Sequence, residues 1–138
     1  MMRPSAEQRE WASRLLASEG ASESSHEIAE VAGRVYDKLH AHLDPLLGAA
    51  GVRALLVRSA KLTEVEFPFL RTPTIQGSMK LRECLREQEP TIAAAAAATL
   101  FGTFFALITT FIGERLTTQL LRSAWPTIEQ MTPMETTK

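Results

Sequence analysis

The chain has 138 residues, of which 45% are hydrophobic, and it carries a formal net charge of −1 and one cysteine. This length suffices for one domain with a buried core and is too short for two. The nearly balanced charge gives no overall attraction to nucleic acid, so we expect no nucleic-acid partner. The single cysteine excludes an intrachain disulfide and, together with the lack of an apolar signal segment near the N-terminus, it predicts a cytoplasmic protein.

Two amphipathic helices are predicted before residue 45. A short first helix has an apolar face around Trp11. A second helix begins after Ser24, where Glu27 three residues on completes a capping box. It repeats apolar residues at helical spacing: Ile28, Val31, Ala32, Val35, Leu39 and Leu43. We expect it to end at Asp44 and Pro45, because a capping aspartate followed by a first-turn proline starts a new helix.

A third helix is predicted from about Gly51 to Phe67, and it carries a candidate basic contact patch. Three cations fall within a wedge of about 140 degrees on this helix: Arg53, Arg58 and Lys61. One interpretation is a contact with phosphate or with an acidic partner. The other is a solvated face that pairs with the nearby Glu64 and Glu66.

The segment from Pro68 to Gly77 contains two prolines, so it is predicted to be a long connection. Apolar residues at its start should hold it against the core: Phe67, Phe69 and Leu70. A fourth helix is expected from Ser78, with Cys84 facing inward as an unreactive residue and Arg82 facing solvent.

The stretch from Thr91 to Trp125 is expected to be the element on which the others pack. Its first 23 residues carry no charge, and they include six consecutive alanines. Alanine is the strongest helix former, and Pro90 suits the first turn of a helix. We expect one long helix, or two nearly collinear helices with a bend at Gly113, ending where Pro126 follows Trp125.

Residues 91–113 also satisfy the length criterion for a membrane span. The large apolar side chains occupy only the later half of this run, which is shorter than a hydrocarbon core of about 30 Å. The flanking charges are mixed, with Glu89 before and Glu114 and Arg115 after the run, so they define no orientation. The main interpretation is a core helix in a soluble bundle, and a membrane anchor is the alternative.

Four small residues spaced by four lie on one face of the central helix: Ala94, Ala98, Gly102 and Ala106. Small side chains allow another helix to approach closely. This face is therefore a candidate oligomer interface, and a neighbouring helix of the same chain is the alternative explanation. Glu114 and Arg115, which follow the charge-free run, are expected either to cap the core or to form a polar contact between subunits.

No catalytic, cofactor-binding or metal site is predicted. His40 and His42 point in nearly opposite directions on a helix, so they cannot share one metal ion. Asp37, His40 and Asp44 do share a face, which leaves a weak metal or charge-relay pattern. The pattern HEIAE has glutamate where a zinc-protease helix has its second histidine.

The sequence thus predicts an all-α domain over residues 1–125, followed by a flexible tail over 126–138. Four to five helices should pack around the apolar helix at about 91–125. We expect a non-enzymatic protein-protein interaction or regulatory module that self-associates, as a homodimer in the simplest case. The alternatives are a single-pass membrane-anchored accessory protein and a sensor of small apolar ligands, with a pocket near the four phenylalanines of the central stretch.

Overall fold

The computed structural model describes residues 6–18, 24–70 and 77–125, and within these ranges every regular element is helical. The elements are α1 (Ala6–Ser18), α2 (Ser25–Leu47), α3 (Ala49–Thr63), the 3-10 turn η1 (Pro68–Leu70), α4 (Ser78–Arg86), α5 (Pro90–Ile112) and α6 (Glu114–Ala124). The all-α class is confirmed, with six α-helices in the described part instead of the four or five expected. The tail predicted over residues 126–138 lies outside the described residues.

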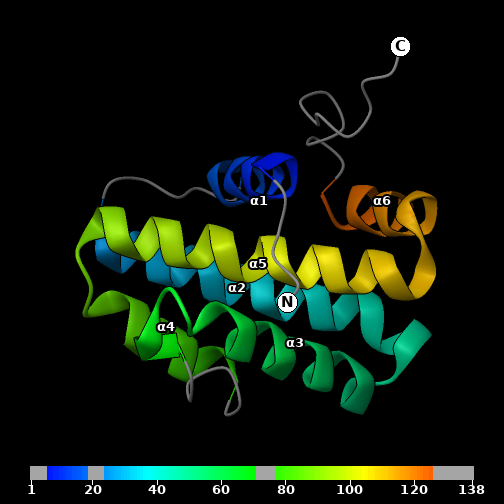
Figure 1. Cartoon of the computed structure of the whole chain (residues 1–138), viewed down its shortest axis with the longest axis horizontal. Helices are drawn as coiled ribbons and strands as arrows, with labels where there is room; N and C mark the ends of the chain where they lie inside the picture. Colours follow the sequence, from blue (N-terminus) through cyan, green and yellow to red (C-terminus); the bar gives the residue numbers. More distant parts are fainter. Residues whose placement is uncertain (1–5, 19–23, 71–76, 126–138) are drawn as a thin grey trace.

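α5 is the central helix, as predicted. It packs against α1, α2, α3 and α6, with α1 and α6 on one side and α3 on the other (Figure 1). Pro90 occupies its first turn, where no amide hydrogen is required. The rings of Phe101, Phe104 and Phe105 are fully or almost fully buried. They give the core most of its bulk beside the small alanines.

The chain reverses direction at Gly113, so the prediction of one long helix or two nearly collinear helices is wrong. Gly113 has φ 92° and ψ 158°, a conformation that residues with a side chain rarely adopt. Its amide still donates to the carbonyl of Thr109 at 2.8 Å, which completes the last turn of α5. α6 then runs back along the bundle (Figure 1). Only this reversal buries Leu121 and Trp125 against the core.

α2 continues through Pro45 to Leu47, so the boundary predicted at Asp44 and Pro45 is also wrong. A proline removes one amide donor and strains the preceding turn. Here the proline lies in the last turn of the helix, where few backbone hydrogen bonds remain to be disrupted. The chain instead turns at Gly48, and α3 begins directly after it. The predicted start of α2 is confirmed, because Ser24 Oγ accepts from the amide of Glu27 at 3.3 Å.

The connection after α3 is held to the core at its start, as predicted. α3 ends at Thr63, earlier than expected, and the chain then turns through η1. Leu70 is fully buried, and Phe67 and Phe69 pack against the core from partly buried positions. The two rings meet edge to face with centroids 6.0 Å apart. Residues 71–76 of the predicted connection lie outside the described residues.

Candidate functional site at the glycine-turn end of the bundle

The small-residue face of the central helix is largely used within the chain. Ala98, Gly102 and Ala106 are buried, and α1 packs along α5 (Figure 1). Ala94 is exposed and lines a groove that also borders α1. The neighbouring helix that explains this spacing is therefore an intramolecular one. A second copy of the chain would need a different surface.

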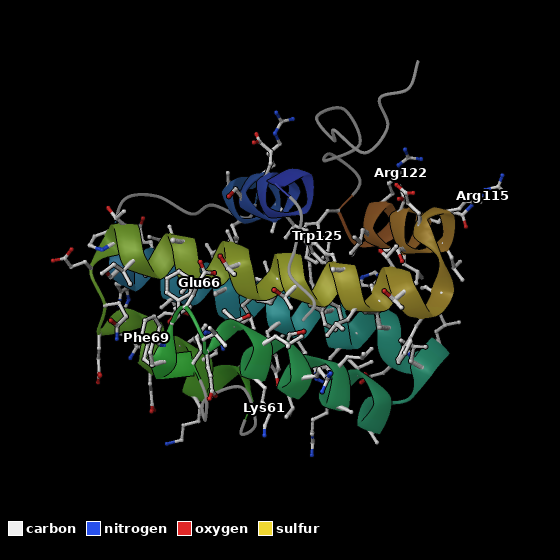
Figure 2. The ribbon with its side chains drawn as sticks, in the orientation of Figure 1. Lys61, Glu66, Phe69, Arg115, Arg122 and Trp125 are labelled. Atoms are coloured by element: carbon white, nitrogen blue, oxygen red, sulfur yellow. The ribbon has the colours of Figure 1, made fainter. Side chains whose placement is uncertain are left out.

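The basic contact patch lies on the outer face of α3, where Arg53, Arg58 and Lys61 are all exposed. Figure 2 shows Lys61 pointing away from the bundle. Within the described ranges, these cations form no ion pair with Glu64 or Glu66. The three charges are spread along one convex helix, so this face offers a partner electrostatic attraction alone.

Asp37, His40 and Asp44 do not converge on one point. His40 Nδ1 lies 2.9 Å from Asp44 Oδ1, whereas Asp37 Oδ2 lies 3.8 Å from Nη2 of Arg82 in α4. The His40 ring also packs on Tyr36, with ring centroids 5.3 Å apart. Across the part of the chain that the structure describes, no three histidine, cysteine or acidic side chains are grouped to hold a metal ion.

Arg82 joins α4 to α2 instead of facing solvent as predicted. Its side chain is only 15% exposed, and Nε lies 3.3 Å from Oε1 of Glu30. Arg86 reaches the other oxygen of the same carboxylate at 3.6 Å. Arg82 Nη1 also donates to Ser78 Oγ at 3.1 Å. This cluster of charges holds two helices together, so we assign it a structural role.

Cys84 is not activated as a nucleophile. Its Sγ donates to the carbonyl of Phe69 at 3.1 Å. Burial, with a further contribution from Glu87, raises the pKa of the thiol to about 11. Because the thiolate is the reactive form, the protonated thiol is unreactive at neutral pH. The prediction of an unreactive packing residue agrees with this environment.

Two glycine turns lie at the same end of the bundle (Figure 1). Gly48 joins α2 to α3 with φ 85° and ψ 145°, and Gly113 joins α5 to α6 with φ 92° and ψ 158°. The preceding helices, α2 and α5, are both 23 residues long. Leu46 and Phe111, each two residues before its glycine, are 50% and 68% exposed. The two corners therefore repeat one structure, and each leaves a large apolar side chain in water.

We call the surface formed by the exposed residues of these corners the end face: Leu46, Phe111, Glu114, Arg115 and Leu116. Figure 2 shows Arg115 pointing away from the bundle at this end. Neither Glu114 nor Arg115 forms an ion pair with any residue that the structure describes. A single exposed apolar residue is ordinary, but several at one end with charges of both signs are typical of a contact surface.

The sequence pattern indicated Glu114 and Arg115 as a possible contact between subunits, but it did not identify the exposed apolar residues beside them. The available signal was local: Gly113 follows Phe111 closely, and the charged pair Glu114 and Arg115 comes directly after it. No comparable signal marked Leu46, because the turn after the second helix was expected at Asp44 and Pro45 and not at Gly48.

Comparison with known proteins adds no assignment to this geometry. No family model matches the sequence, and neither a curated protein nor a solved structure matches the chain.

Proposed function

We propose that this chain is a non-enzymatic helical module that associates with a second copy of itself through the end face. The observation that carries the proposal is the ring of Phe111, 68% exposed at the corner between α5 and α6. The corner between α2 and α3, where Leu46 is 50% exposed, lies at the same end of the bundle as the corner between α5 and α6 (Figure 1).

The apolar part of the end face favours a contact of limited strength. Removing apolar surface from water contributes about 25 cal/mol per Å². Three partly exposed side chains fall well short of the roughly 800 Å² per partner that a standard stable interface buries. We therefore expect a dimer that forms and dissociates with concentration, and not an obligate one.

The end face carries one negative and one positive residue, so the end faces of two copies can be electrostatically complementary. In a two-fold contact the same patch occurs on both sides, so Glu114 of one copy can face Arg115 of the partner subunit, and the reverse. Each exposed ion pair contributes at most about 1 kcal/mol. Such pairs set the orientation of a contact more than its affinity. The two ion pairs would favour the two-fold dimer over other arrangements that bury Phe111.

The test is the molar mass by light scattering on a sizing column over a range of concentrations. The mass should rise from monomer toward dimer. Glu114→Arg and Arg115→Glu should each weaken this association, and the double variant should restore it because the pairs re-form with opposite polarity. Arg58→Glu, on the outer face of α3, makes the same charge change away from the end face and should leave the mass unchanged. A double variant as weak as the single ones would contradict the pairing.

A membrane-anchored accessory protein remains the second candidate. α5 is long and apolar enough to cross a membrane by length and composition, which favours this function. However, 78% of its most apolar window is buried against the rest of the chain, which favours a core helix. Expression without detergent separates the two. We expect the protein in the soluble fraction, whereas protein found only in the membrane pellet would support the anchor.

A further inference from the structure

A groove of about 500 Å³ runs between α1 and the N-terminal half of α5. This volume falls within the range of about 300–1,000 Å³ that small-molecule sites occupy. Its surface includes Ala94, Ala98 and Thr99 of α5. Phe67, from the turn after α3, contributes a partly buried aromatic ring. The groove is therefore separate from the end face and lies mainly over the alanine-rich part of the central helix.

Two carboxylates from different elements line this groove: Glu10 of α1 and Glu66 of the turn after α3. Figure 2 shows Glu66 beside the N-terminal half of α5. Glu66 makes no ion pair with the residues that the structure describes. Glu10 is paired with Arg14 at 3.3 Å, but the two side chains are 55% and 40% exposed, so that pair is weak. The groove thus combines an apolar surface with negative charge.

Thr99 supplies a hydroxyl group to the groove. Other buried threonines donate to the carbonyl four residues earlier: Thr63 at 2.7 Å, Thr103 at 2.8 Å and Thr117 at 2.8 Å. The hydroxyl of Thr99, a residue only 5% exposed, makes no hydrogen bond within the described part of the chain. This hydroxyl is therefore available to a polar group of a bound molecule.

We propose that this groove binds an aliphatic ammonium cation. Its alkyl chain would lie on Ala94 and Ala98, and its ammonium group would face the carboxylates of Glu10 and Glu66. An ammonium group has three donors, so the Thr99 hydroxyl can accept one of them. The Phe67 ring adds cation–π attraction. Charge selects this ligand class, because the two carboxylates repel an anion and give a neutral chain no electrostatic attraction.

The experiment is an NMR titration of the full chain with n-hexylammonium and with 1-hexanol, which has the same chain length without the charge. Hexylammonium should bind at least about fivefold more tightly, with affinity that falls as salt is added. Glu66→Gln should weaken hexylammonium binding about fivefold and leave hexanol unchanged. Thr99→Val should also weaken it. Glu64→Gln removes one negative charge two residues away from Glu66 and serves as the matched control.

Three results would overturn the proposal: equal affinity for the two compounds, no binding of hexylammonium, or an equal loss in Glu64→Gln and Glu66→Gln. Equal affinity for the two compounds would mean that the groove binds only the alkyl chain. An equal loss in the two variants would mean that hexylammonium is attracted to the overall negative charge and not to Glu66. Because the end face is remote from these residues, the mass of the protein should be the same in Glu66→Gln and wild type. An unchanged mass would show that the loss of hexylammonium binding does not arise from a change in self-association.

Discussion

The guanidinium group of Arg82 in α4 lies directly over Gly33 in α2. A Cβ atom placed on Gly33 would come within 2.2 Å of Arg82 Cζ. The absence of a side chain at this position therefore lets Arg82 reach Glu30 at 3.3 Å and Asp37 at 3.8 Å. The close approach of the Arg82 guanidinium group to α2 therefore depends on the absence of a side chain at Gly33.

Gly33→Ala should lower the free energy of unfolding by about 1–2 kcal/mol. Alanine favours a helix over glycine by up to about 1 kcal/mol, but the new methyl group displaces Arg82 from its half-buried ion pairs. Gly51→Ala is the matched control, since the nearest atom to its Cβ is 3.8 Å away, and it should be stabilising. Urea unfolding of both variants measures this, and equal stabilisation of the two would contradict the close contact.

Phe104→Ala and Phe111→Ala should differ sharply although both lie on α5. Phe104 is fully buried, so its truncation should cost about 3–5 kcal/mol. Phe111 is 68% exposed, so its truncation should change stability by no more than about 0.5 kcal/mol. Thermal or urea unfolding of the monomer at low concentration gives both values. Similar losses in the two variants would show that Phe111 belongs to the core.

Gly113→Ala should destabilise the fold by about 1–3 kcal/mol, because the observed φ of 92° and ψ of 158° suit glycine alone. Among the residues that the structure describes, no atom would lie within 4 Å of a Cβ at this position. Any loss therefore reports backbone strain and not a clash. An unchanged unfolding midpoint would argue that α5 and α6 tolerate a different turn.

Cys84 predicts a pH dependence with a definite sign. Its pKa in the folded chain, about 11, lies above the ordinary value of 9.0. Between these values the unfolded thiol ionises while the folded thiol keeps its proton, so the free energy of unfolding falls as pH rises from 9 toward 11. In Cys84→Ser, no thiol ionises, so this contribution to the pH dependence of the unfolding free energy is absent. Urea unfolding at pH 7, 9 and 10.5 should show a smaller loss in the variant, and parallel losses would exclude Cys84 as the cause.

Local signals predicted the parts of the fold that depend on neighbouring residues. Ser24 and Glu27 identified the start of α2, and Pro90 identified the start of α5, because capping and first-turn proline preferences act within one turn of helix. The charge-free run identified α5 as the core helix. Such features require no knowledge of the rest of the chain.

The remaining features depend on contacts between distant residues. Gly113 was recognised as a break, but only the burial of Leu121 and Trp125 determines that α6 folds back. The small-residue face was recognised from its spacing, but the spacing does not indicate which helix packs beside it. The end face and the groove each join segments that are far apart in sequence, so neither could be predicted from spacing along one helix.

The most direct test of the end face is the molar mass of Phe111→Ser, measured by light scattering across the same concentrations as wild type. Met79→Ser is the matched control, because Met79 is 64% exposed and lies in α4, outside the end face. We predict that Phe111→Ser stays monomeric at concentrations where wild type and Met79→Ser approach the dimer mass. A wild-type protein that is monomeric throughout, or a Phe111→Ser variant with the wild-type mass, would contradict self-association through the end face.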